Sequence, residues 1–329
     1  MTSQRSKRMY LGSLRAAQLH FRILRIAGSS VGVVLREHRQ RSVEFPDGVQ
    51  VFPARAPAHQ GYSNRVHPTI LVHGHRGARA VLPENTLPAF EYAISAGADA
   101  LEMDVAVTRD DVVVVTHDPK LNPVICRSPG GPTVIRESTL AELASWDCGA
   151  LRNPRFRSQR IIPGTRMPTL DQVLALADRG SFLFNIEMKS YPERPALAPP
   201  PERFSELVLQ AIRRHKLETR VIVQSFDFRT LHAMRRLDPE IRLAALYAGP
   251  PKDFISISKE AGSGIVAPHY VLVTQRRVYR ARCAGLEVIS WTANTPRQWK
   301  RLIAAQVDGI ITDDPAALIE YLRERALRQ

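Results

Sequence analysis

From about residue 68 to the C-terminus, short apolar runs alternate with segments in which apolar residues recur at helical spacing. Short apolar runs are typical of buried strands, and the periodic segments predict amphipathic helices. The expected strands are 69–73, 100–107, 182–188, 220–225, 241–247, 264–267, 287–292 and 309–312. The expected helices are 86–95, 170–177, 203–215, 228–237, 255–261, 275–284, 296–305 and 316–326.

This alternation predicts an α/β protein with a parallel sheet. Eight strand–helix pairs over about 260 residues match the size of a (β/α)8 TIM barrel. A doubly wound open sheet is the alternative, but no Gly-x-Gly-x-x-Gly motif follows the first strand. We therefore expect a barrel domain over 68–329, preceded by a basic extension and linker over 1–67.

One stretch interrupts the alternation, at about residues 118–167. A short strand is expected just before it at 112–116, and a helix within it at 139–145. The segment is predicted to be an insertion on a βα loop after the second strand. Loops of this kind form the active-site face of a barrel.

The overall charge is strongly positive, at +14, whereas the hydrophobic share of 44% is ordinary for a globular protein. Residues 1–43 hold nine Lys or Arg and a single acid, Glu37. A basic surface attracts polyanions, so the extension is compatible with weak contact to an anionic membrane. No nucleic-acid motif accompanies the charge, and no nucleic-acid partner is expected.

The cysteines and the N-terminal apolar run give indications of the cellular compartment of the protein. Cys126, Cys148 and Cys283 are too widely spaced for a zinc site, and we expect no disulfide framework. Their odd count favours a reducing, cytoplasmic location. The apolar run 26–35 is shorter than the ~20 residues that span a bilayer and resembles a signal peptide poorly. A periplasmic, secreted or membrane-peripheral protein is the alternative.

Acidic side chains stand out on two of the expected strands. Glu102 and Asp104 share one face of 100–107, and Glu187 shares a face with Lys189 on the following long strand. Because neighbouring strands lie about 4.8 Å apart, the three carboxylates could converge. Oxygen ligands favour a hard cation, Ca²⁺ or Mg²⁺. The alternative is a structural network in which Lys189 or Arg76 neutralises them.

Two histidines lie at strand ends near these carboxylates. His75 ends the first strand, and His117 follows the short strand after the acidic one. Two imidazoles can share the work of general base and general acid near neutral pH. Arg76 and Lys189 carry charge suited to a phosphate group. His73 lies on the same face as His75 but deeper, and we expect it to serve packing.

Other polar and aromatic residues fit two interpretations each. Glu84 and Asn85 open the first helix, where they could cap it or support His75 and the cation site. Trp291 near the end of the seventh strand could line the pocket or belong to the core.

Several ordered motifs resemble those of the glycerophosphodiester phosphodiesterases. The resemblance covers roughly residues 69–325, and no single motif is specific, whereas the whole series in order is. The motifs are His75-Arg76-Gly77, Pro83-Glu84-Asn85-Thr86, Glu102-Met103-Asp104, His117-Asp118, Glu187-Met188-Lys189, Gln224-Ser225-Phe226-Asp227, Ser290-Trp291-Thr292 and Asp308-Gly309-Ile310-Ile311-Thr312-Asp313.

The resemblance implies a TIM barrel that hydrolyses glycerophosphodiesters, small deacylated phospholipids, to sn-glycerol 3-phosphate and an alcohol. It implies a divalent cation bound by Glu102, Asp104 and Glu187, with His75 and His117 as the acid/base pair. It also implies phosphate contacts from Arg76 and Lys189 and a glycerol pocket lined by Trp291. Both a cyclic-phosphate route and direct attack by water are consistent with these residues.

Two other functions are consistent with parts of the sequence. The basic extension would suit a related enzyme that cleaves a lysophospholipid at a membrane surface. The high pI alone would suit a barrel that only binds phosphate ligands or nucleic acid, but the intact acid, base and metal set disfavours it.

Overall fold

The computed structural model describes residues 70–127, 130 and 133–328. The expected extension and linker over 1–67, including the apolar run 26–35 and the proposed membrane contact, lie outside the described residues.

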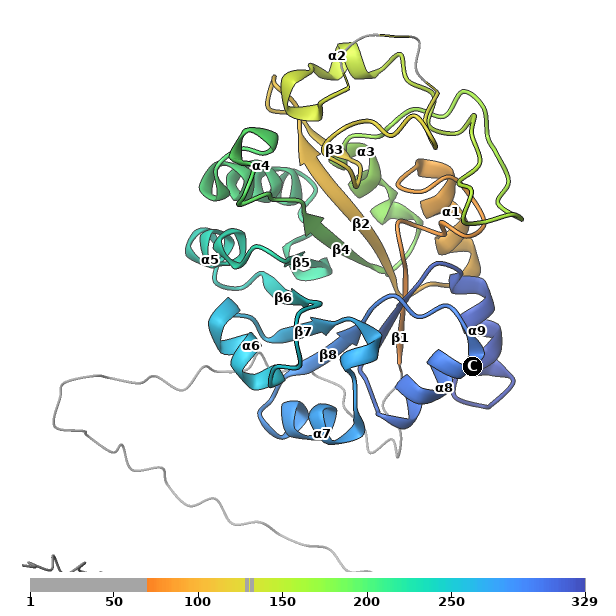
Figure 1. Ribbon diagram of the computed structural model, residues 1–329, viewed down its shortest axis with the longest axis vertical. Coiled ribbons are helices and arrows are strands. Elements are labelled where there is room, and N and C mark those ends of the chain that lie inside the picture. The colour runs from red at the N-terminus through yellow and green to blue at the C-terminus, as the bar shows by residue number, and fades with distance from the viewer. Residues whose placement is uncertain (1–69, 128–129, 131–132, 329) are drawn as a thin grey trace, which may run out of the picture. The chain divides into compact units, whose positions relative to one another are not determined.

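Eight parallel strands in the described part of the chain form a closed barrel (Figure 1). They pair in the order β1-β9-β8-β7-β6-β5-β4-β2, and a β1–β2 pairing closes the ring. This confirms the predicted (β/α)8 barrel. The strands are β1 (Leu71–Gly74), β2 (Ala100–Val107), β4 (Leu183–Met188), β5 (Val221–Ser225), β6 (Arg242–Tyr247), β7 (Ile265–Pro268), β8 (Glu287–Ser290) and β9 (Gly309–Thr312).

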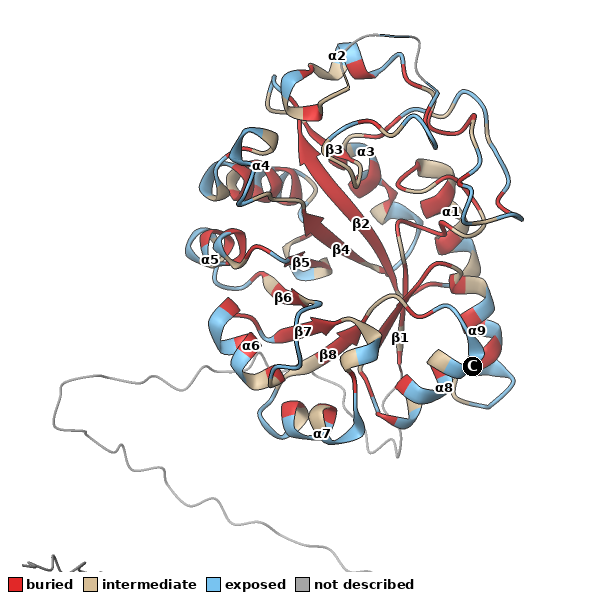
Figure 2. Ribbon diagram, in the orientation of Figure 1, coloured by how far each residue is buried: buried red, intermediate tan, exposed pale blue. Residues whose placement is uncertain are grey.

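Helices surround the strands and turn their buried sides toward the barrel (Figure 2). The bounds are α1 (Leu87–Ala96), α2 (Leu140–Leu143), α3 (Leu170–Leu174), α4 (Pro201–Arg214), α5 (Phe228–Leu237), α6 (Phe254–Ala261), α7 (Gln275–Cys283), α8 (Pro296–Ala304) and α9 (Pro315–Arg323). Each predicted strand and helix is present, with its ends displaced by up to three residues. Helix α4 begins early, at Pro201, because proline suits the first helical position.

The insertion after β2 is built as predicted. Strand β3 (Val113–Val115) pairs antiparallel with β2 and lies beside the barrel. The segment beyond it contains a 3-10 turn at Ile135–Glu137 and helix α2, which Thr139 and Glu142 start with a capping box. It has its own small core, in which Leu143 and Trp146 are buried.

Two of the cysteines are bonded to each other inside this insertion. Cys126 and Cys148 form a disulfide, and Cys283 is the free cysteine of the described residues. The expectation of no disulfide framework is therefore wrong, because residues far apart in sequence meet in the insertion. The cytoplasmic location argued from an odd cysteine count loses that support.

Thiol counting tests this bond directly. Protein unfolded without reductant should show one reactive thiol, and three after reduction, because the Cys126–Cys148 bond hides two. Titration with a thiol-reactive chromophore provides the count. Three thiols in the unreduced protein, prepared with free thiols blocked at lysis, would contradict the bond.

The barrel interior has an apolar half and a polar half. Apolar side chains from β5 to β9 fill one half, namely Ile222, Ala244, Leu246, Ile265, Ala267, Ile289 and Ile311. Buried polar side chains from β1, β2, β4 and β5 occupy the other, namely His73, Glu102, Asp104, Asn185, Glu187 and Gln224. Since buried polar groups are costly without partners, the polar half marks the functional side of the barrel.

His73 lies at the bottom of the polar half, as expected, with no exposed surface. Its Nδ1 is 3.4 Å from the Asn185 amide nitrogen, and its Nε2 has no hydrogen-bond partner. Burial lowers the pKa of His73 to about 4, although Asp99 partly opposes the shift. The folded protein therefore holds this ring neutral.

His73 should make the protein less stable in acid. Between pH 6.5 and about 4 the unfolded chain protonates this histidine and the folded chain does not. Stability is therefore lost as pH falls through this window, by about 2 kcal/mol at pH 5. Urea unfolding at pH 7 and pH 5 should show a smaller loss for His73→Gln than for wild type. Equal losses in both, with exposed His232→Gln as control, would contradict the assignment.

No helix among the described residues is long and apolar enough to cross a membrane.

Candidate active site

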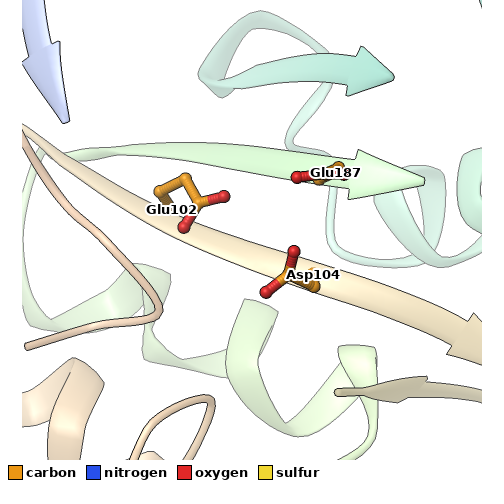
Figure 3. A group of neighbouring side chains, drawn as sticks. All are labelled: Glu102, Asp104 and Glu187. Atoms are coloured by element: carbon orange, nitrogen blue, oxygen red, sulfur yellow. The ribbon is translucent and has the colours of Figure 1, made fainter. Parts of the chain in front are cut away.

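Three carboxylates converge inside the polar half of the barrel (Figure 3). Asp104 of β2 is the register partner of Glu187 of β4, and Glu102 lies two residues earlier on the same face of β2. Their exposed fractions are 2% for Glu102, 1% for Asp104 and 7% for Glu187. One oxygen from each lies within 4.8 Å of the others. The predicted convergence is confirmed.

The carboxylates do not ionise equally. Burial, followed by the charges of Asp104 and Glu187, raises the pKa of Glu102 well above its usual value. Burial also raises the pKa of Glu187, and the nearby Lys189 opposes this shift. For Asp104, burial opposes ionisation, but Arg76 and Lys189 outweigh it and hold the pKa far below the usual range. The cluster therefore carries more negative charge than its neighbours stabilise.

The chemistry of this cluster fits a divalent cation. Asp104 Oδ1 is buried without a hydrogen-bond partner, as expected of an oxygen that a cation would satisfy. All donors are hard oxygens, which suits Ca²⁺ or Mg²⁺. When all are ionised, the carboxylates exceed the basic side chains by two charges. The five acids are Glu84, Glu102, Asp104, Glu187 and Asp313, against Arg76, Arg79 and Lys189.

The basic residues predicted to contact phosphate also pair with these acids. Arg76 Nε lies 3.0 Å from Asp104 Oδ2, and Lys189 Nζ lies 2.7 Å from Glu187 Oε1 and 3.7 Å from Asp104 Oδ1. The salt-bridge network considered as an alternative is therefore present. It leaves room for a cation, because the carboxylates of the network outnumber its basic side chains by two, five against three.

The loop after β1 carries Arg76 and Asn85 in an unusual backbone conformation. Arg76 and Asn85 have φ values of 50° and 56°, a region that non-glycine residues rarely adopt. Gly77 has a φ of 84°, and a Cβ there would lie 2.6 Å from the carbonyl carbon of Ala89. Glycine at position 77 is thus required by the tight approach of this loop to α1.

Glu84 and Asn85 do not cap the first helix. The cap position of α1 is Thr86. Glu84 accepts hydrogen bonds from Arg76 and Asn153, at 2.5 and 2.9 Å. The Asn85 amide donates to Asp104 Oδ2 at 3.0 Å. The capping interpretation is therefore wrong, and both side chains position members of the site.

His75 is held by Asp313, the residue that follows the last strand of the barrel. Its Nδ1 donates to Asp313 Oδ1 at 2.5 Å, and the other Asp313 oxygen accepts from the Asn294 amide at 2.7 Å. His75 Nε2 consequently faces the site, 4.0 Å from Glu102 Oε2. Burial lowers the pKa of His75, and the bond to Asp313 pulls it partly back. A neutral imidazole with its free nitrogen toward the carboxylates can accept a proton.

His117 lies across the cavity and has a similar partner. Its Nδ1 is 2.7 Å from Asp118 Oδ1, and the other Asp118 oxygen accepts from Asn122 at 3.2 Å. Its side chain is 36% exposed, against 13% for His75. The two histidines therefore sit in different surroundings, His75 mostly buried and His117 more open to water.

A cavity of about 240 Å³ joins these groups. Its walls include His75, Arg76, Glu102, His117, Glu187 and Lys189, with Trp291 and Phe226 on the apolar side. Trp291 is half-buried, and its indole nitrogen donates to the Ala267 carbonyl at 2.7 Å. Trp291 therefore lies in the cavity wall and also packs against the apolar half of the barrel interior.

Some residues of the site were not assigned a role from sequence. Asp313 directly follows β9, and Gln224 is the second-last residue of β5, positions near the active-site face that could have indicated a role. Gln224 donates to Glu102 at 3.1 Å. Nothing in the sequence pattern indicated a role for three further residues, Arg79, Asn153 and Arg155. The folded loop after β1 and the insertion bring them to the site.

Comparison with known proteins connects this geometry to a family. The model of the glycerophosphoryl diester phosphodiesterase family matches residues 75–317. A glycerophosphodiester phosphodiesterase of Caldanaerobacter subterraneus is 34% identical over 260 residues, covering 77% of this chain and 98% of that protein. One of Bacillus altitudinis is 31% identical, covering 77% and 98%.

Comparison with solved structures agrees with this family assignment. A structure from Silicibacter pomeroyi, assigned as a glycerophosphoryl diester phosphodiesterase, superimposes with a TM-score of 0.74 at 32% identity, covering 79% of this chain and 95% of that one. An Oleispira antarctica phosphodiesterase, solved with the product sn-glycerol-3-phosphate, gives a TM-score of 0.66 at 21% identity, covering 77% and 96%. The likeness to the Oleispira antarctica structure, at this low identity, shows that the two proteins share the fold.

Proposed function

The chain belongs to the glycerophosphoryl diester phosphodiesterase family and is a glycerophosphodiester phosphodiesterase, in which we propose separate roles for the carboxylates and the histidines. Glu102, Asp104 and Glu187 hold its divalent cation. His75 and His117 are its acid and base. The reaction converts a glycerophosphodiester to sn-glycerol 3-phosphate and an alcohol. The observation that carries the proposal is one cavity lined by Glu102, Glu187 and both histidines, with an Asp104 oxygen within 4.8 Å of the other two carboxylates.

The carboxylate cluster supplies the place for the cation, Ca²⁺ or Mg²⁺. When bound there, a divalent cation neutralises the charge of the diester and polarises its phosphorus. Asn85 and Gln224 hold the carboxylates in place through hydrogen bonds to Asp104 and Glu102. Since these amides stay neutral at every working pH, they fix the ligands without competing for the charge.

His75 is the general base in this proposal. Its lowered pKa keeps it neutral near pH 7, and Asp313 fixes the proton on Nδ1 so that Nε2 can accept one. His117 is the general acid, held by Asp118 and open to the solvent side where an alcohol departs. Positioned acid and base groups of this kind contribute typically 10²–10⁴-fold to the rate.

Arg76 and Lys189 stabilise the phosphate oxygens. Both are within ion-pair distance of Asp104, so they lie at the edge of the cation site. Fixed positive charge in a buried site is more effective than in water, because no solvent must reorganise. Arg76 is itself fixed by Glu84.

A substrate panel tests the function. Purified full-length protein loaded with Ca²⁺ or Mg²⁺ should release glycerol 3-phosphate from glycerophosphocholine and related diesters, and excess EDTA should abolish the release. Coupled oxidation of glycerol 3-phosphate provides the measurement. A metal-loaded, folded protein that is inactive across the panel would refute the assigned substrate class.

A further inference from the structure

An arginine-rich segment of the insertion borders the catalytic cavity. Between Asp147 and Asp171 the chain has no acidic residue and five exposed arginines, namely Arg152, Arg155, Arg157, Arg160 and Arg166. Arg155 lines the catalytic cavity, and so does Arg79 from the loop after β1. The proposed acid–base chemistry uses neither of these two guanidinium groups, which we call the arginine pair.

Buried hydrogen bonds hold the backbone of Arg155 in place. Asn153 and Gln159 are 7% and 1% exposed. The Asn153 side chain donates to Glu84 at 2.9 Å and accepts from the Arg155 backbone N–H at 3.1 Å. The Gln159 side chain accepts from the Asn153 backbone N–H at 2.8 Å and donates to the Arg79 carbonyl at 2.7 Å. The insertion is thus fastened to the loop after β1, and Arg155 extends from a fixed point in the cavity wall.

The charge of Arg155 is not neutralised within the described part of the chain, where its guanidinium has no ion-pair or hydrogen-bond partner. The other basic side chains of the cavity wall, Arg76, Arg79 and Lys189, each have a carboxylate within 3.1 Å. A bound divalent cation would balance the five carboxylates against these three bases. Arg155 then adds a positive charge that is available to a ligand.

Arg79 has an unused hydrogen-bond donor. Its side chain is 9% exposed and lies over the ring of Phe156, with Cζ 5.3 Å from the ring centroid. One terminal nitrogen pairs with Glu84 at 3.1 Å, whereas the buried Nε has no hydrogen-bond partner and lies 3.9 Å from Asp313 Oδ1. Buried donors without an acceptor are rare because they are costly. An anionic ligand group in the cavity would supply the missing acceptor.

The arginine pair lies on the side of the cavity from which the alcohol departs. His117, the proposed general acid, directly precedes the insertion that carries Arg155. Glu84 connects the two, because it lines a small pocket with His117 and accepts a hydrogen bond from Asn153. The apolar wall with Trp291 comes from other strands of the barrel. An alcohol that takes its proton from His117 therefore leaves toward the insertion.

We propose that the arginine pair binds a phosphate group carried by the departing alcohol, so that the enzyme favours glycerophosphodiesters with a second phosphate. This inference rests on the proposed function and narrows its substrate class. Arginine is well suited to this task, because its planar guanidinium makes charge-assisted hydrogen bonds to two phosphate oxygens. The arginine pair contacts a part of the substrate that does not react, and the bond that breaks is unchanged.

Two diesters that differ by one phosphate test this preference. Glycerophosphoinositol and glycerophosphoinositol 4-phosphate share the glycerol, the diester and the ring. With full-length protein and a divalent cation in excess, kcat/KM should be about tenfold higher for the 4-phosphate, as expected of one charge-assisted contact. Added salt should lower this ratio, because Arg155 is exposed and its charge is screened. Release of glycerol 3-phosphate provides the measurement.

Arg155→Gln assigns the preference to a residue. The substitution should reduce the ratio of the two kcat/KM values to less than about twofold, mainly through KM, since the contact is made in the ground state as well. Activity on glycerophosphoinositol should change less than about twofold, because the reacting groups are untouched. Arg157→Gln is the matched control, since Arg157 is exposed in the same segment and does not line the cavity. It should keep the wild-type ratio.

The outcomes separate this inference from the proposed function. Equal kcat/KM for the two diesters in wild type would overturn the inference and leave the proposed function standing. An equal loss on both diesters in Arg155→Gln would do the same, because it would place Arg155 on the diester that they share. An equal fall of the ratio in Arg157→Gln would overturn it in favour of general surface charge. No turnover of either diester or of glycerophosphocholine would overturn the proposed function, and this inference with it.

Discussion

Replacing His75 with alanine should lower kcat for glycerophosphodiesters by about 10²–10⁴-fold while the protein folds normally. The side chain lies at the cavity wall, with Nε2 4.0 Å from Glu102 Oε2, whereas the other imidazole of the cavity, His117, is held by Asp118. Steady-state kinetics on glycerophosphocholine would measure the loss, and circular dichroism would confirm folding. Retained activity would contradict the assigned role of His75.

Asp313→Asn tests whether Asp313 tunes His75 electrostatically or only holds it in place. Asparagine keeps the shape but removes the charge that holds the His75 Nδ1 proton. Because Asp313 raises the pKa of His75 against the effect of burial, its loss should move the acidic limb of the kcat/KM profile to lower pH. It should also reduce kcat by as much as about 10⁴-fold, the loss seen when a catalytic histidine loses its aspartate partner. A reduced rate with an unmoved pH profile would indicate a merely structural role.

Removing a carboxylate from the cluster should abolish cation-dependent activity. Asp104→Asn takes away the one strongly ionised ligand, which faces Glu187 across the β2–β4 pair and holds an unpartnered buried oxygen. Loss of a metal that polarises phosphorus removes several kcal/mol of transition-state stabilisation. We expect activity to fall at least about a thousandfold, in line with that magnitude.

Cation binding can be followed without the reaction. Adding Ca²⁺ or Mg²⁺ to wild-type protein should raise Tm, since a ligand that binds the folded state stabilises it. It should also release protons, because burial and the charges of Asp104 and Glu187 raise the pKa of Glu102, and a carboxylate that binds a cation must be deprotonated. Asp104→Asn should show neither effect, whereas the exposed Glu142→Gln control should behave like wild type. A cation-dependent Tm shift that survives in Asp104→Asn would place the cation elsewhere.

Much of the site could be predicted from strand periodicity. Alternation along 100–107 places Glu102 and Asp104 on one face whatever the rest of the chain does, because side chains of a strand alternate. The same rule places Glu187 and Lys189 on one face of the strand 182–188 and its end. Pairing of neighbouring strands then brings the acids together, as the β2–β4 register shows. Strand ends likewise point His75 and His117 toward the active-site face.

The roles of Glu84, Asn85 and the cysteines were not accessible in this way. At the start of a helix, a carboxylate and an amide are typical capping groups, and nothing local distinguishes a cap from a residue directed elsewhere. Only the left-handed backbone at Asn85 turns its amide onto Asp104. Cys126 and Cys148 meet because the insertion folds back on itself, a contact that spacing in the chain does not encode.

Local patterns thus suffice for the class of fold, the carboxylate cluster and the two histidines, because these follow from the repeat of a strand and the common direction of parallel strands. Contacts between distant segments decide the rest. Asp313 reaches His75 only when β9 closes the barrel beside β1. Asn153 reaches Glu84 only when the insertion covers the loop after β1. Arg155 reaches the cavity through the same contact, since its place depends on segments that lie far apart in the sequence.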